Sequence, residues 1–69
     1  MEGNPVNRKR LFLKKARKKK NWSQKQMAEF LNISRSYYSA IENGFRDPSL
    51  KLAVAISDLL DLDVRRFIS

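Results

Sequence analysis

The side chains that could do chemistry in this chain are mostly basic: 15 Lys and Arg stand against 7 Asp and Glu, for a net charge of +8. There is no histidine and no cysteine, so the usual general base, the usual zinc ligands and any disulfide framework are missing. No paired carboxylates or other catalytic constellation can be recognised. We therefore expect no enzymatic activity, no metal and no cofactor, and a polyanion as the partner.

The positive charge is concentrated at the N-terminal end. Residues 1–20 hold nine Lys and Arg and one Glu, a net of +8, whereas residues 21–46 carry +1 and residues 47–69 carry −1. Nucleic acid and an anionic membrane surface both attract such a segment. A membrane-bound helix needs an apolar face free for lipid, and here the core needs that face. With no long apolar run and no signal peptide, we expect a cytoplasmic protein that does not bind membranes.

Capping signals and apolar spacing place these residues on helices. Ser23 and Gln26 form a capping box, and Ser34 is an N-cap. Asn32 suits the left-handed residue that closes a helix, and Gly44 ends the next one. The pattern predicts five short helices and no strand, over residues 5–20 (opened by Asn4 and Pro5), 23–32, 34–43, 47–60 and 64–68. We expect one domain over residues 1–69, with a basic segment at 1–10.

The second and third helices are separated by about three residues around Asn32, which is the spacing of a helix-turn-helix over residues 24–43. Ala28 is small enough for the two helices to cross closely, and Ile33, Tyr38 and Ile41 supply the apolar contacts between them. The second helix of such a unit enters the major groove of DNA.

The stretch "ARKKKNWSQKQMAEFLNISRSYYSAIENGFRDPSL" resembles the phage-repressor/Cro-type helix-turn-helix transcriptional regulators, which have a lambda-repressor-like DNA-binding domain. The likeness runs from about Leu11 to Ile68. It depends on Ser23-Gln24, Ala28, Leu31, Ser34, Ile41-Glu42-Asn43-Gly44 and Pro48-Ser49-Leu50, which stand in register with the family pattern. It implies an all-α, compact five-helix domain of bacterial or phage origin, sequence-specific binding of double-stranded DNA, and usually a homodimer acting as repressor or activator.

The resemblance also implies roles for individual residues. Its DNA-binding positions correspond to Gln24, Arg35, Ser36, Ala40, Asn43 and Arg46. Apart from the resemblance, Ser23, Ser34, Tyr37 and Ser39 are further candidates for contact with DNA. Arg35 is the strongest of these, because an arginine at the start of a recognition helix can bond guanine O6 and N7. Lys18 to Lys20 are the lysines expected nearest to phosphate. Arg17 and Glu42 match a family pair that forms an internal salt bridge.

The adjacent tyrosines, Tyr37 and Tyr38, cannot share a role, because neighbouring helical side chains point about 100° apart. Tyr38 precedes Ile41 by three residues and should be in the core, with its hydroxyl at the rim. Tyr37 should lie at the boundary with DNA, with phosphate as its first contact and a thymine methyl as its second.

The C-terminal third carries more apolar side chains than a small monomer covers easily. Either the core uses all of them, or Leu59, Val64, Phe67 and Ile68 form a twofold dimer interface, which we favour. A dimer would place two recognition helices about 34 Å apart on a near-palindromic operator. The alternative function is an antitoxin-type DNA-binding protein that neutralises a toxin, which predicts an exposed apolar stripe around Phe30. We expect no small-molecule effector.

Overall fold

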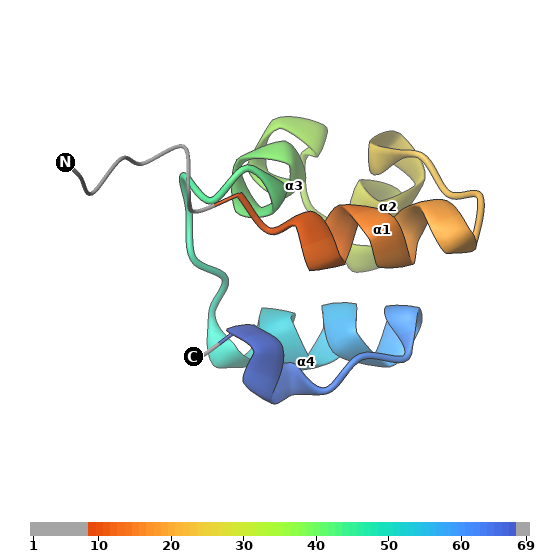
Figure 1. Ribbon diagram of the computed structural model, residues 1–69. Helices are drawn as coiled ribbons and strands as arrows, with labels where there is room; N and C mark the ends of the chain where they lie inside the picture. The colour runs from red at the N-terminus through yellow and green to blue at the C-terminus, as the bar shows by residue number, and fades with distance from the viewer. Residues whose placement is uncertain (1–8, 68–69) are drawn as a thin grey trace, which may run out of the picture.

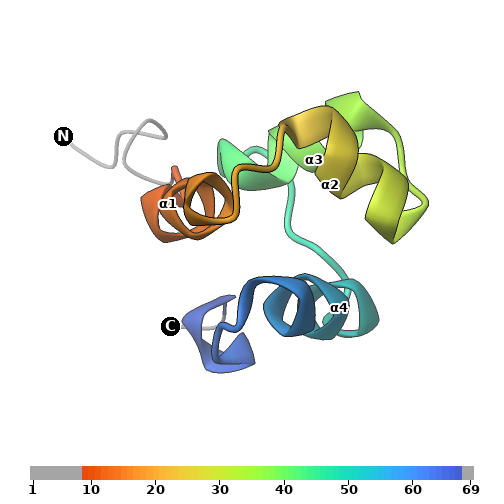
Figure 2. The same ribbon diagram turned by 90° about the vertical axis from the view of Figure 1, so that its right-hand side faces the viewer.

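The computed structural model describes residues 9–67, and this range is all-helical, as predicted. Its elements are α1 (Leu11–Lys19), α2 (Gln24–Leu31), α3 (Arg35–Glu42), α4 (Leu50–Leu60) and a short 3-10 turn, η2 (Val64–Phe67). Helices α1, α2 and α3 form one group, and α4 lies across the molecule from them together with η2 (Figures 1 and 2). No helix in the described range is long and apolar enough to cross a membrane.

The prediction of five helices is wrong in its last element. The segment after Asp63 is a four-residue 3-10 turn, in which the Arg66 N–H donates to the Asp63 carbonyl at 2.9 Å. The Asp63 carboxylate accepts the Arg65 N–H at 2.9 Å, so the aspartate caps this turn as an N-cap would. Four residues suffice for one 3-10 turn but not for a stable α-helix.

The first helix begins at Leu11, not at residue 5. Lys9 and Arg10 are not helical, because the Arg10 N–H donates across the fold to the Glu42 carbonyl at 2.9 Å. The predicted start at Asn4 and Pro5 lies outside the described residues. The helix therefore starts where its first inward residues, Phe12 and Leu13, reach the core.

Serines cap the next three helices, as predicted for Ser23 and Ser34; the cap at Ser49 was not predicted, and α4 begins at Leu50, not at residue 47. The Ser23 hydroxyl accepts the Gln26 N–H at 3.0 Å, and the Gln26 side chain accepts the Ser23 N–H at 2.8 Å, which completes the capping box. Ser34 and Ser49 cap α3 and α4 through single bonds of 3.1 and 3.2 Å. These caps fix where α2, α3 and α4 begin.

Three turns contain a non-glycine residue in the left-handed conformation: Asn21 (φ 60°), Asn32 (φ 59°) and Asp61 (φ 57°). Asn and Asp tolerate this region better than other side chains because their short polar groups bond locally. Asn32 closes α2 and makes the turn to α3 only three residues long. The tight connection is the one that the helix-turn-helix spacing predicted.

The core draws on all four helices. Its fully buried large side chains are Leu13, Met27, Tyr38, Ile41 and Ile56. Ile56 and Leu60 of α4 reach this cluster, so α4 closes the core from the side opposite the other helices. Tyr38 is buried as predicted, but its hydroxyl is buried with it and does not reach the rim.

Candidate nucleic-acid interface

The inward side of α3 is held by a buried polar network. Arg17 donates from Nε to Glu42 Oε2 at 2.9 Å and from Nη2 to Oε1 at 3.0 Å. Its third donor, Nη1, bonds the Trp22 carbonyl at 2.8 Å. Gln24 adds a bond from Nε2 to Glu42 Oε1 at 3.0 Å. This network ties α1, the α1–α2 turn and the start of α2 to the end of α3.

The network controls the charge of its members. Burial alone would raise the pKa of Glu42, but hydrogen bonds from Arg17 and Gln24 outweigh it and the pKa falls below its ordinary value. The hydrogen bond from Glu42 raises the pKa of Arg17 against the opposing effect of burial. Glu42 and Arg17 are therefore both charged at neutral pH, and each neutralises the other inside the fold.

Tyr38 lies beside this pair. Burial, followed by the nearby Glu42 carboxylate, raises the pKa of its phenol, which stays protonated. Its hydroxyl has no hydrogen-bond partner among the described residues. The expectation of a partner at the rim is thus wrong, because the side chain is held entirely within the core by its ring.

The outward side of α3 carries a different set of residues. Positions 35, 36, 39, 40 and 43 recur at the helical spacing, opposite the buried Tyr38, Ile41 and Glu42. Arg35 and Ser36, in the first turn, are exposed; the three others are half-buried: Ser39, Ala40 and Asn43. Within residues 9–67, no carboxylate pairs with the Arg35 guanidinium. Five of the predicted DNA-binding residues therefore share one accessible strip.

Local hydrogen bonds orient the small polar side chains on and beside this strip. The Ser34 hydroxyl accepts the Tyr37 N–H at 3.1 Å and lies 3.3 Å from the Ser36 hydroxyl. Further along the helix, Asn43 Nδ2 donates to the Ser39 hydroxyl at 3.3 Å. Each hydroxyl can still donate or accept one more bond, so these groups stay available to a ligand.

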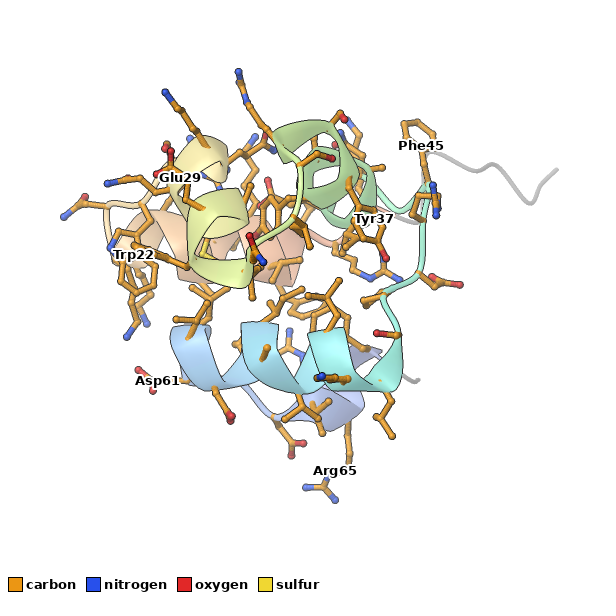
Figure 3. All side chains as sticks on the ribbon, turned by 180° about the vertical axis from the view of Figure 1, so that it is seen from behind. Trp22, Glu29, Tyr37, Phe45, Asp61 and Arg65 are labelled. Atoms are coloured by element: carbon orange, nitrogen blue, oxygen red, sulfur yellow. The ribbon has the colours of Figure 1, made fainter. Side chains whose placement is uncertain are left out.

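Tyr37 and Arg46 form one unit at the edge of this strip. The Arg46 guanidinium lies over the Tyr37 ring, 5.1 Å from its centroid, while the ring packs against the core. Tyr37 also lines an apolar groove of about 330 Å³ with Leu31, Ile33 and Leu52. Phe45, which precedes Arg46, is 72% exposed on the same side of the molecule (Figure 3). Tyr37 is thus a half-buried support for Arg46 rather than a freely exposed side chain.

The lysines of α1 divide into two groups. Lys14, Lys15, Lys18 and Lys19 are exposed. Lys20, which was expected near phosphate, instead bonds Asp61 at the end of α4 (Nζ to Oδ2, 2.8 Å) and lies over the Trp22 ring. Lys20 therefore joins α1 to α4, and the exposed lysines supply the long-range attraction for an anion.

The described residues of the predicted dimer interface have little exposed surface to offer a second copy. Leu59 and Val64 are half-buried. Phe67 packs edge-on against Phe12, with ring centroids 5.5 Å apart, so it serves the fold of its own chain. Ile68 lies outside the described residues.

Arg10 was not among the predicted site residues; its side chain is 13% exposed and contacts the α3–α4 loop. Its partners are 31 to 37 residues away, so no local pattern could have identified it. Within the described range, no group of His, Cys, Asp and Glu side chains could hold a metal ion.

Comparison with known proteins agrees with this geometry. The model of the helix-turn-helix family matches residues 13–67, which is most of the chain. The chain belongs to this family, in its Cro/C1 type.

Its relatives include proteins of Bacillus subtilis and of a Bacillus phage. The HTH-type transcriptional regulator AnsR of Bacillus subtilis is 45% identical over 49 residues, covering 71% of this chain and 42% of AnsR. The uncharacterized HTH-type transcriptional regulator YqaF of the same bacterium is 41% identical over 54 residues, covering 78% of this chain and 71% of YqaF. The ImmF control region 10 kDa protein of Bacillus phage phi105 is 44% identical over 53 residues, covering 77% of this chain and 59% of the phage protein. The chain thus spans less than half of AnsR and more than two thirds of YqaF.

Proposed function

We propose that this chain binds double-stranded DNA in a sequence-specific way, as a homodimer on a near-palindromic operator, and regulates transcription by occupying that site. The observation that carries the proposal is the outward strip of α3, whose donors are accessible while the opposite side of the same helix is locked into the core. A rigid helix with one free polar face suits the major groove of B-DNA.

Each part of the site has a chemical task in this proposal. Arg35 reads a guanine through a bidentate pair to O6 and N7, and Ser36 bonds a neighbouring base edge. Ala40 is half-buried and offers only a methyl group, which suits contact with a thymine methyl.

Phosphate contacts come from the ends of the helices. Gln24 uses one N–H of its amide on Glu42 and keeps a second N–H for a phosphate oxygen. The Ser23 hydroxyl accepts a backbone N–H, so its own hydrogen is free to donate. Asn43 and Arg46 provide the corresponding contacts at the other end of α3, and the exposed lysines of α1 add long-range attraction.

The dimer is supported by the apolar surface of the C-terminal region. Leu59 and Val64 are half-buried on α4 and η2, and in a dimer the remaining exposed part of each would be covered by a second copy. Two copies related by a twofold axis would read two half-sites one DNA turn apart. Occupancy of such a site would repress by excluding polymerase, or activate by contacting it.

The test is selection of bound sequences from a random pool of DNA duplexes, with the affinity of the selected duplex measured at several salt concentrations. We expect a near-palindromic sequence with two equal half-sites, and an affinity that falls steeply with salt because counterions are released from the phosphates. Sedimentation at micromolar concentration should show a species of twice 8.1 kDa. The proposal would be contradicted if no sequence were enriched from the pool and if the affinity for DNA did not change with salt concentration.

A second candidate function is the antitoxin type, in which the chain also binds a toxin protein. Phe30 favours it, because this ring is 50% exposed and packs edge-on against Trp22 at 5.0 Å between centroids. Co-expression with the neighbouring reading frame, followed by purification of wild-type and Phe30→Ala chains, tests it. A stoichiometric partner that is lost from the Phe30→Ala chain would support this function; a chain that purifies alone would oppose it.

A further inference from the structure

Arg10 joins three parts of the molecule that are remote in sequence. Its Nη1 donates to the Ile41 carbonyl at 2.6 Å, within α3, and to the Arg46 carbonyl at 3.1 Å, in the α3–α4 loop. Its Nη2 bonds Asp47 Oδ1 at 2.6 Å. The guanidinium also lies 5.7 Å from the centroid of the Phe67 ring. One side chain at the start of α1 thus holds the end of α3, the loop and η2.

The loop that Arg10 holds begins with a sharp reversal. Gly44 has a φ of 81°, and the Phe45 and Arg46 N–H groups both point back to the Ala40 carbonyl, at 2.9 and 3.2 Å. These bonds hold the first half of the loop against α3. The Arg46 carbonyl and the Asp47 carboxylate are held by Arg10 instead.

The held loop sets the position of two outward side chains. Arg46 lies over Tyr37, and Phe45 is 72% exposed beside it. Both follow the outward strip of α3 directly in the sequence. A shift of the loop backbone would therefore move the cation that borders this strip, although Arg10 itself is 13% exposed and its charge is paired with Asp47.

We propose that Arg10 is a positioning residue for DNA binding: it fixes the α3–α4 loop so that Arg46 and the loop backbone meet the phosphates flanking the bases read by α3. This inference rests on the proposed function. It assigns Arg10 an indirect task, because three of its five donors bond two carbonyls and one carboxylate within the fold, whereas Arg46 is exposed and makes the contact. A lysine at position 10 could keep the charge but not the planar fork of donors.

The first test compares Arg10→Lys with wild type on the duplex that wild type selects. We expect binding roughly tenfold weaker, because a point charge cannot hold both carbonyls and the carboxylate. The slope of log affinity against log salt should fall by about one phosphate contact. An unchanged affinity and slope in a folded Arg10→Lys protein, checked by its thermal midpoint, would overturn the proposal.

The second test uses Asp47→Asn and needs no change to the core, because the Asp47 side chain is 89% exposed. Removing a negative charge should by itself tighten binding to DNA. The positioning role predicts the reverse, binding roughly threefold weaker, because one arm of the Arg10 contact is lost. Asp58→Asn is the matched control: it removes the same charge from an exposed position on α4, and it should bind at least as tightly as wild type.

Amide hydrogen exchange provides a readout that does not need DNA. The Phe45 and Arg46 amides should exchange faster in Asp47→Asn than in Asp58→Asn, while core amides such as that of Ile56 stay unchanged. Asp47→Asn that binds as tightly as Asp58→Asn, with wild type still binding, would overturn this inference alone. Wild-type protein that binds no duplex would overturn the proposed function and this inference with it.

Discussion

The two sides of α3 satisfy their polar groups in opposite ways. Tyr38, Ile41 and Glu42 face inward and are at most 5% exposed; the Glu42 carboxylate pairs with Arg17 and accepts a further hydrogen bond from Gln24. Arg35 and Ser36 face outward, exposed to solvent. The inward side therefore determines where the helix lies, and the outward side keeps solvent-exposed donors that a ligand can bond in place of water.

The buried side uses an ion pair where apolar side chains would suffice for stability. Arg17 and Glu42 connect α1 to α3, and Gln24 connects the start of α2 to the same carboxylate. Such a pair has one correct geometry, unlike an apolar contact. We infer that it fixes the rotation of α3 about its axis, and with it the direction in which Arg35 points.

The substitution Tyr38→Ala should break the inward side most severely. Removing a fully buried aromatic ring costs about 3–5 kcal/mol, and a chain this small has roughly 0.05–0.15 kcal/mol of stability per residue. We expect a largely unfolded protein by circular dichroism and urea titration. A cooperative transition at the wild-type urea midpoint would show that the ring is not part of the core.

The substitution Arg17→Met should cost about 3–5 kcal/mol by leaving the Glu42 carboxylate buried without its partner. The double variant Arg17→Met with Glu42→Met should recover most of that loss, because no charge then remains buried. Urea titrations of both variants measure the difference. A double variant as unstable as the single one would mean that packing volume, not the stranded charge, is responsible.

On the outward side, Arg35→Ala should leave the fold intact and lose about 1–3 kcal/mol of discrimination at one base pair per half-site. Competition between the selected duplex and duplexes changed at single positions measures this loss. Arg65→Ala is the matched control, since it removes the same charge from the far side of the molecule (Figure 3). Uniform weakening across all duplexes would identify Arg35 as a phosphate contact instead.

Acid should lower the free energy of unfolding in a defined pH range, because the inward side of α3 holds the Glu42 carboxylate. Because the pKa of Glu42 is lower in the folded protein than its ordinary value of 4.5, the carboxylate stabilises the fold above that value. Stability should then fall as the pH drops from 4.5 through the folded pKa. Urea midpoints between pH 7 and pH 3 test this.

Asp63→Asn serves as the comparison for the acid experiment. Hydrogen bonds from Arg65 lower the pKa of Asp63 to about 2, but this carboxylate lies at the surface. The variant should therefore keep the wild-type loss of stability in acid. Loss of that pH dependence in Asp63→Asn would place the acid-sensitive group at the surface instead of in the core.

The smallest effect is expected for Tyr38→Phe. The hydroxyl is buried and has no hydrogen-bond partner among the described residues, so deleting it should change the free energy of unfolding by less than about 1 kcal/mol, or raise it. Urea titration measures the change. A loss of more than about 2 kcal/mol would mean that the hydroxyl bonds the Arg17–Glu42 pair in solution.

Features set by neighbouring residues were predictable from the sequence. The capping box at Ser23, the left-handed turn at Asn32 and the burial of Tyr38 follow from local chemistry and helical spacing, and the structure confirms them. Contact between Tyr37 and DNA stays a prediction. The prediction that the Tyr38 hydroxyl lies at the rim of the core was wrong, because the depth of this group depends on how α1 and α3 pack.

Features set by distant partners were not predictable. The lysine run looks uniform in sequence, yet Lys20 alone turns to Asp61, 41 residues away. Arg10 resembles any other residue of a basic segment, and its role depends on a loop that begins more than 30 residues later. Long-range pairing of this kind is decided by the packing of the helices, which no local pattern contains.

The most direct test of the central claim is a titration of isotopically labelled protein with the selected duplex, followed by NMR of each backbone amide. We expect the largest shifts at Arg35, Ser36, Ser39 and Ala40, with smaller ones at Gln24 and Arg46 and little change along α4. Shifts that are largest on Lys14 to Lys19, with α3 unaffected, would contradict it: the chain would then bind DNA through its basic helix, and the outward side of α3 would not be the reading surface.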